Sequence, residues 1–272
     1  MYTLRYTNHR TYYTDTHHSY YTDTHRIYYA SHLLHRYASM CFREGEVWDS
    51  KRLAKLHAKA AVLHTLAFLA SFVLVVSYPN KIVVDGFQVS AWIALFFGVT
   101  AIFEMLASQV RVMRVRLNDG YAGARWIEYS MSATMMLVAI AQLSTLTNAV
   151  VLVNAVAIPS IITMIAGYLA EKRRSMGWFY AGCVVGIVPW IPIAERFFAN
   201  VHDVPDFVIA IFVSLFILFL PFPVIAWFYL QEHINFAEAE FYYTVASFTA
   251  KFALGIQVLA GALRSGDEDI EY

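Results

Sequence analysis

Seven mostly apolar stretches of about 20 or more residues run through this chain, and each is long enough to cross the hydrocarbon core of a bilayer as a helix. These lengths suit helices and lack the short alternating pattern of a membrane barrel. Residues typical of turns separate the stretches. The pattern predicts an all-α membrane protein with a bundle of seven transmembrane helices, over residues 54–78, 88–110, 124–146, 148–170, 176–199, 205–231 and 236–263.

The connection between the first two spans has a pattern of its own. Ile82, Val83 and Val84 are followed by Asp85 and Gly86, which is a turn signal after a β-branched run. We therefore predict a short pair of strands outside the bilayer within residues 81–88.

The chain before the first span is polar and repetitive. The hexapeptide Tyr-Tyr-Thr-Asp-Thr-His occurs at residues 12–17 and again at 20–25, and six of the ten histidines lie in the first 40 residues. Metal binding is one interpretation, but nothing fixes these histidines in a coordination geometry. We favour a low-complexity, disordered extension over residues 1–50, with Met40 as an alternative start. A helical domain over 51–264 and an acidic tail over 265–272 would follow.

Composition agrees with a membrane protein. Hydrophobic residues make up 59% of the 272 residues and charged residues only 15%, too few to cover a globule. The net charge is zero, which gives no reason to expect a nucleic-acid partner. Cys41 and Cys183 indicate neither a disulfide framework nor a metal site. No phosphate loop or nucleophile motif lies outside the spans, so we expect no enzyme.

The basic residues at the ends of the spans predict an orientation. Ten lie on the side of the chain's start and three on the other: Lys51, Arg52, Lys55, Lys59, Arg111, Arg114, Arg116, Lys172, Arg173 and Arg174 against Lys81, Arg196 and Arg264. Basic residues favour the cytoplasmic side. We expect the N-terminus in the cytoplasm and, after seven crossings, the C-terminus outside.

Lys251 lies in the middle of the last apolar stretch, where a charged side chain costs roughly 2.5–3.5 kcal/mol on insertion scales. One interpretation is a structural lysine paired with a carboxylate of another helix. The other is covalent chemistry, because a desolvated lysine loses its proton readily and forms a Schiff base with an aldehyde.

Other ionisable residues within the spans are candidates to act with Lys251: His64, Glu104, Arg125, Glu128 and Glu195. Judged by depth, Glu128 and Glu104 are the expected carboxylate partners of the lysine. Glu195 falls in the opposite half of the bundle, where Arg196 and the nearby interface could simply solvate it. His64 is either a hydrogen-bonded structural residue or a proton relay.

Two hydroxyl groups share a helix face with the central charges. Ser132 follows Glu128 by four residues, and Ser247 precedes Lys251 by four.

Two of these segments resemble a known family. Arg-Trp-Ile-Glu-Tyr-Ser-Met-Ser at 125–132 is similar to the third-helix signature of heliorhodopsins, and Ser-Phe-Thr-Ala-Lys at 247–251 resembles their retinal-binding stretch. Ala141-Gln142, the run from Gly182 to Trp190 and the histidine of the first span add to the likeness, which covers about 51–263. The inverted orientation deduced from the charges is also a property of that family.

The resemblance implies all-trans retinal bound to Lys251 as a protonated Schiff base, with Glu128 as its counterion. A buried cationic imine needs such a carboxylate to stay protonated. Met136, Trp190, Phe219 and Phe222 are expected walls of the polyene pocket, although ordinary helix packing would also explain them. Members of the family form dimers, so a homodimer is expected in the lipid bilayer.

Four positions depart from the family pattern. Glu104 stands where relatives carry a histidine, and Glu195 adds an ionisable group to a half that is largely apolar in the family. We therefore hypothesise proton movement in light through Glu104, Glu128 and Glu195. Pro221 and Pro223 should bend the sixth helix beside the pocket.

Three functions compete at this point. The first is a retinal photoreceptor that signals to a partner, and the second is light-driven or light-gated proton conduction. The third is a transporter or structural membrane protein with no pigment, for which neither broken helices nor repeat symmetry is evident.

Overall fold

The computed structural model describes residues 50–77, 83–84, 87–118, 122–202, 204 and 206–264. They belong to one compact unit, Trp48–Tyr272. The expectations for the histidine-rich extension, for Met40 and for the acidic tail lie outside the described residues.

Each predicted span corresponds to one helix or to two or three consecutive helical elements, with ends within about four residues of the predicted ones. The helices are α2 (Ser50–Ser77), α3 (Val89–Gln109), α4 (Arg111–Asn118), α5 (Gly123–Leu143), α6 (Ala149–Val151), the π-helix η1 (Leu152–Ala157), α7 (Ile158–Arg173), α8 (Met176–Ile187), α9 (Trp190–Ala199), α10 (Asp206–Phe219), α11 (Pro221–Leu230) and α12 (Phe236–Arg264). The short helix α4 was not predicted, because its eight residues lie within a polar connection.

The predicted strand pair is confirmed. Strands β1 (Val83–Val84) and β2 (Phe87–Gln88) pair antiparallel, with Val83 opposite Gln88 and Val84 opposite Phe87.

The chain is an integral membrane protein of helical architecture. In the described part of the chain, six helical stretches are long and apolar enough to cross a membrane: Arg52–Ser77, Val89–Gln109, Ala149–Arg173, Met176–Ala199, Asp206–Leu230 and Phe236–Gly261. Helix α5 is 21 residues long, which corresponds to roughly 31 Å, and it carries two of the predicted site residues, Arg125 and Glu128.

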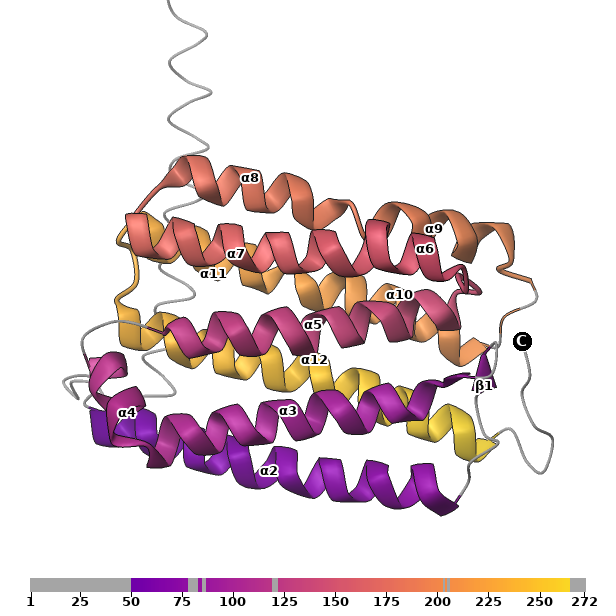
Figure 1. Cartoon of the computed structure of the whole chain (residues 1–272), viewed down its shortest axis with the longest axis horizontal. Helices are drawn as coiled ribbons and strands as arrows, with labels where there is room; N and C mark the ends of the chain where they lie inside the picture. The colour runs from indigo at the N-terminus through magenta and orange to yellow at the C-terminus, as the bar shows by residue number, and fades with distance from the viewer. Residues whose placement is uncertain are drawn as a thin grey trace, which may run out of the picture. The chain divides into compact units, whose positions relative to one another are not determined.

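The helices lie side by side along a common direction (Figure 1). Helix α2 contacts α3 and α12, and α5 lies between α3 and α7. Helix α7 contacts α8, and α8 contacts α11. Because α10 and α11 contact α12, the helices form a closed ring. We call the end where α2, α5, α8 and α12 begin the basic end, because ten of the basic residues named above lie there. It is the left end in Figure 1, next to α4.

Prolines interrupt two of the long helices. Helix α10 ends at Phe219 and α11 begins at Pro221, so the sixth span is interrupted at Leu220, next to the prolines expected to bend it. Proline has no N–H to continue the helical hydrogen bonds. Pro189 separates α8 from α9 in the same way. Both interruptions fall about halfway along a membrane-length helix.

The main apolar core fills the half of the bundle away from the basic end. Ile93, Phe96, Ile140, Leu215 and Leu254 are its best buried members, each at most 1% exposed. They come from α3, α5, α10 and α12, on the side of Lys251 that is further from the basic end. This half is therefore mostly apolar, although Gln142 is buried there and accepts a hydrogen bond from Trp92.

Gly167 of α7 allows a close approach of α5. A Cβ atom at this position would lie 2.3 Å from Cζ3 of Trp126. The indole cannot easily move away, since its Nε1 donates a 2.9 Å hydrogen bond to Glu171. Gly167→Ala should therefore destabilise the bundle by about 1–3 kcal/mol, measured by thermal unfolding of the purified protein.

Gly177→Ala is the matched control for this substitution. The nearest atom to a Cβ at Gly177 is Ser175 Oγ at 3.7 Å, which is ordinary contact. An equal loss of stability in both variants would contradict the proposed steric role of Gly167.

Candidate functional site

Lys251 forms a buried ion pair with Glu128. Its Nζ donates a 2.7 Å hydrogen bond to Oε1 of Glu128, and the two residues are only 2% and 5% exposed. The partner expected from depth is thus brought to the lysine, from α5 to the middle of α12.

Hydroxyl groups from two helices complete this pair. Nζ of Lys251 lies 2.8 Å from Oγ of Ser247, one turn earlier on α12, and Thr100 of α3 donates a 2.5 Å hydrogen bond to Oε1 of Glu128. Thr100 was not predicted, because a lone threonine within an apolar span has no distinctive pattern. Since burial of charge is costly unless the groups are paired and hydrogen-bonded, these contacts make the arrangement tolerable.

His64 lies within an aromatic cage at the level of the lysine. Its Nδ1 donates a 2.8 Å hydrogen bond to the carbonyl of Ala60, and its Nε2 has no partner among the described residues. The rings of Phe97, Phe248 and Phe252 surround it, with centroids 5.6–5.9 Å away. These contacts match the hydrogen-bonded structural histidine considered above.

An apolar cavity of about 440 Å³ opens from Lys251. All four predicted wall residues line it, namely Met136, Trp190, Phe219 and Phe222, and so do Ser132 and Ser247. Ser132 is fully buried, and its Oγ has no hydrogen-bond partner in the described part of the chain. The volume suits a small-molecule site, and we call this space the lysine cavity.

A second set of charged side chains lies between Glu128 and the basic end. Arg125 of α5 makes ion pairs with Glu240 of α12 and, at 2.5 Å, with Glu171 of α7. His57 of α2 donates a 2.6 Å hydrogen bond from Nδ1 to Glu104 of α3. We call these five residues the charged network.

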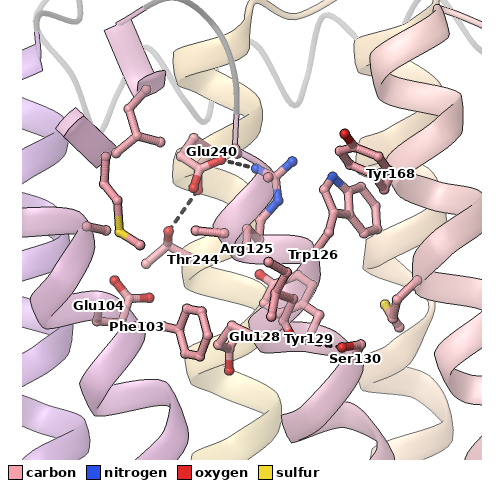
Figure 2. Close-up of a pocket in the computed structure, with 18 of the residues that line it drawn as sticks. Phe103, Glu104, Arg125, Trp126, Glu128, Tyr129, Ser130, Tyr168, Glu240 and Thr244 are labelled. Atoms are coloured by element: carbon pink, nitrogen blue, oxygen red, sulfur yellow. Dashed lines mark hydrogen bonds and ion pairs between the residues drawn. The ribbon is translucent and has the colours of Figure 1, made fainter. Parts of the chain in front are cut away.

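A cavity of about 510 Å³ connects the charged network with Glu128. Figure 2 shows Glu104, Arg125, Glu128 and Glu240 around this space, with the link from Glu240 to Arg125 drawn as a dashed line. His57 lines the same space, and its Nε2 is 3.7 Å from Oε1 of Glu240. We call it the network cavity. It therefore places several ionisable groups within reach of Glu128.

The ion pair stands between the two spaces. Lys251 lines the lysine cavity and Glu128 lines the network cavity, whereas Trp126 and Tyr129 line both. A change in the Lys251–Glu128 contact would thus alter both cavities at once.

Two expectations for acidic side chains need correction: the pairing of Glu104 with Lys251, and the place of Glu195 in a proton path. Glu104 does not pair with Lys251, because its carboxylate is held by His57 on the neighbouring helix. Glu195 is exposed on α9 and lines neither cavity, so the structure does not bring it to the site. Its position on the outside of the bundle agrees with an acid solvated near the membrane surface.

Three members of the charged network were missed in the sequence, His57, Glu171 and Glu240. His57 precedes His64 by seven residues and shares its helix face, which is a signal that could have found it. Glu240 lies in the first turns of its span and Glu171 follows the end of another, so neither stood out as an ionisable residue within a span. The fold turns them inward toward Arg125.

Comparison with known proteins shows the family to which this chain belongs. The family model described as Heliorhodopsin matches residues 53–263, which is more than half of the chain. The chain belongs to the heliorhodopsin family. Membership of this family of rhodopsins implies a retinal chromophore. A search of curated proteins found no match.

Solved structures show the same helical fold in other rhodopsins. The transmembrane domain of Salpingoeca rosetta rhodopsin phosphodiesterase superposes with a TM-score of 0.66 at 15% identity, covering 85% of this chain and 88% of its own. The light-driven proton pump LR (Mac) from Leptosphaeria maculans gives 0.65 at 16% identity, covering 80% and 98%. Cyanorhodopsin N4075R from Tolypothrix sp. NIES-4075 gives 0.64 at 13%, covering 81% and 97%. At such identities the likeness concerns the fold alone.

Arg125 balances the buried carboxylate of Glu240 and the partly buried one of Glu171 in this heliorhodopsin, so its removal should be costly. In Arg125→Met, Glu240 and Glu171 would both lose their guanidinium partner, and we expect a loss of about 3–5 kcal/mol of stability in thermal unfolding. Adding Glu240→Gln to Arg125→Met should restore part of the loss, since one unpaired charge disappears.

Arg196→Met is the control, because Arg196 is exposed at the other end of the bundle. It should change stability by no more than about 0.5 kcal/mol. If Arg125→Met were as mild as Arg196→Met, the network would not hold the basic end together.

Proposed function

We propose that this chain is a light-absorbing photoreceptor in which Lys251 binds all-trans retinal as a protonated Schiff base and Glu128 is its counterion. The single observation that carries the proposal is the 2.7 Å contact of Nζ with Glu128 at the wall of an apolar cavity. In that contact the free amine of Lys251 stands where the imine nitrogen would be.

The surroundings of Lys251 fit a polyene aldehyde. The lysine cavity is walled by Met136, Trp190, Phe219 and Phe222, and Ser132 also lines it, while Ser247 contacts the amine. Such a division between an apolar body and one polar end matches a long hydrocarbon with a single polar group. The Oγ of Ser132, which has no partner among the described residues, is a second hydrogen-bonding group in the cavity wall.

When bound, retinal supplies absorption of visible light and isomerisation of its polyene. The residues of this chain then have separate tasks. Glu128 keeps positive charge at Nζ favourable, Thr100 holds Oε1 of Glu128 in place, and the aromatic walls exclude water. A weaker contact between Nζ and Glu128 would allow a proton to move toward the charged network.

The membrane arrangement forms part of the proposal. Helix α5 has the length of a span and packs between α3 and α7, which are themselves apolar enough to cross. We count it as the seventh crossing. With the basic end in the cytoplasm, the N-terminus is inside and the C-terminus outside. A homodimer and a signalling partner remain predictions from the family.

Reconstitution with all-trans retinal tests the binding residue. The protein should acquire a visible absorption band, and Lys251→Ala should lose it completely, because no other lysine of the described residues lines the lysine cavity. Lys59→Ala, which removes an exposed lysine of α2, should keep the band. A visible band that persists in Lys251→Ala would refute the assignment.

Glu128→Gln tests the counterion by absorption spectroscopy. Removal of the carboxylate takes away the charge that stabilises the cation, so the band should move to the red or the pigment should deprotonate. Glu104→Gln is the matched control, because Glu104 bonds to His57 and not to Lys251. An unchanged spectrum in Glu128→Gln would exclude the counterion role.

Proton transport through the bundle is the second candidate function. The charged network favours proton exchange on the basic side, since it joins Glu128 through one cavity. The half of the bundle away from the basic end differs in its ionisable groups. Among the described residues, the buried Lys, Arg, His and Glu side chains lie at the level of Lys251 or nearer to the basic end. The outer step through Glu195 therefore has no support in the packing, and we favour the photoreceptor.

Recording from voltage-clamped cells separates the two functions. We expect light to cause proton uptake or release at the basic side without a stationary current, and Glu195→Gln to change neither signal. A stationary photocurrent that Glu195→Gln abolishes would establish the transport function instead.

A further inference from the structure

The network cavity opens on the outside of the bundle as well as toward Glu128. Ile127 of α5 and Ile165 of α7 line it, and they are 58% and 51% exposed, so this part of the cavity faces the surrounding bilayer. We call it the lateral groove. Its walls are apolar or aromatic side chains of α4, α5 and α7, namely Met113, Leu117, Ile127, Ile161, Ile165 and Tyr168.

Helix α7 gives the lateral groove one continuous wall. Ile161, Met164, Ile165 and Tyr168 all line it, and their spacing of i, i+3, i+4 and i+7 places them on a single face of the helix. This face is roughly 10 Å long, and it lies within a helix that is long and apolar enough to cross the membrane. The lateral groove therefore suits a hydrocarbon chain that runs along α7.

Positive charge surrounds the groove at the basic end. Lys172 is exposed one turn after Tyr168, and its Nζ lies 5.4 Å from the centroid of the Tyr168 ring. Helix α4, which forms another wall, holds three arginines and no acidic residue among its eight residues. The neighbouring carboxylate of Glu171 is held by Arg125 at 2.5 Å. An anionic group at this end of the groove would thus meet basic side chains.

We propose that the lateral groove binds one anionic phospholipid, whose acyl chain lies along α7 and whose phosphate contacts Lys172 in the positive field of α4. Phosphate oxygens accept charge-assisted hydrogen bonds from an ammonium group, and basic residues beside a membrane attract anionic lipids. The bound chain covers the outward opening of the cavity that holds Glu104, Glu128 and Glu240. These carboxylates are then shielded from the bilayer on this side.

Native mass spectrometry of the protein released from nanodiscs tests the choice of lipid. Phosphatidylglycerol should be retained in a saturable way, at one molecule per chain. Phosphatidylcholine with the same acyl chains carries its own ammonium group, so it should bind about tenfold more weakly. Equal retention of the two lipids would overturn the proposal.

A charge substitution tests the head-group contact. Lys172→Gln should lower the affinity for phosphatidylglycerol about fivefold, as expected for one basic group at a membrane surface. Arg173→Gln is the matched control, because it removes the same charge from the next residue, whose guanidinium lies over the ring of Trp178 on α8. Equal losses in the two variants would indicate a general surface field and overturn the site.

A steric substitution tests the position of the acyl chain. Ile165→Trp should fill the lateral groove and abolish the saturable retention of phosphatidylglycerol. Ile162→Trp on the same helix should keep it, because Ile162 is 45% exposed and lines neither cavity. Unchanged retention in Ile165→Trp would place the lipid elsewhere and overturn the proposal.

Photo-crosslinking locates the lipid in the unsubstituted protein, so its result does not depend on how the variants fold. Phosphatidylglycerol with a diazirine in its acyl chain should label the segment 161–168 of α7. An excess of unlabelled phosphatidylglycerol, but not of phosphatidylcholine, should suppress this label. A segment without label would refute the proposal, and so would a second copy of the chain found seated on the groove.

Discussion

The buried contact between Lys251 and Glu128 is the constraint on which the rest of the structure depends. Two charges in a bilayer interior are tolerated only when they are paired and hydrogen-bonded. Three helices meet that requirement together: α12 provides the amine and Ser247, α5 provides the carboxylate, and α3 provides Thr100. The pair therefore sets how these three helices lie against one another.

The same pair divides the interior chemically. On one side is an apolar cavity that suits a polyene, and on the other is a cavity lined by Glu104, His57 and Glu240. Beyond the pair, away from the basic end, the core is mostly apolar, and its buried polar side chains, such as Ser90, Gln142 and Ser144, are uncharged. An event at Lys251 can thus reach ionisable groups in one direction only, which favours a light sensor over a transporter.

Much of this arrangement was predictable from the chain, and the part that was not has a clear cause. Segment length and turn residues located the helices, and the position of Lys251 within an apolar stretch marked the site. Depth along a helix follows from counting residues, but the direction in which a side chain points between neighbours does not. For that reason Glu128 was placed correctly, while Glu104 was paired with the wrong group and Glu195 was given a role that its exposure does not support. Glu171 and Glu240 were missed because both lie close to span ends, where acids are common, and only the packing turns them toward Arg125.

Chemical mapping of the retinal attachment point tests the central claim most directly. Reduction of the pigment with borohydride should make the bond to the chromophore permanent, and peptide mass spectrometry should then find the retinyl group on Lys251. A retinyl group on another lysine, such as Lys55 or Lys59, or no adduct in a sample that shows a visible band, would contradict the account.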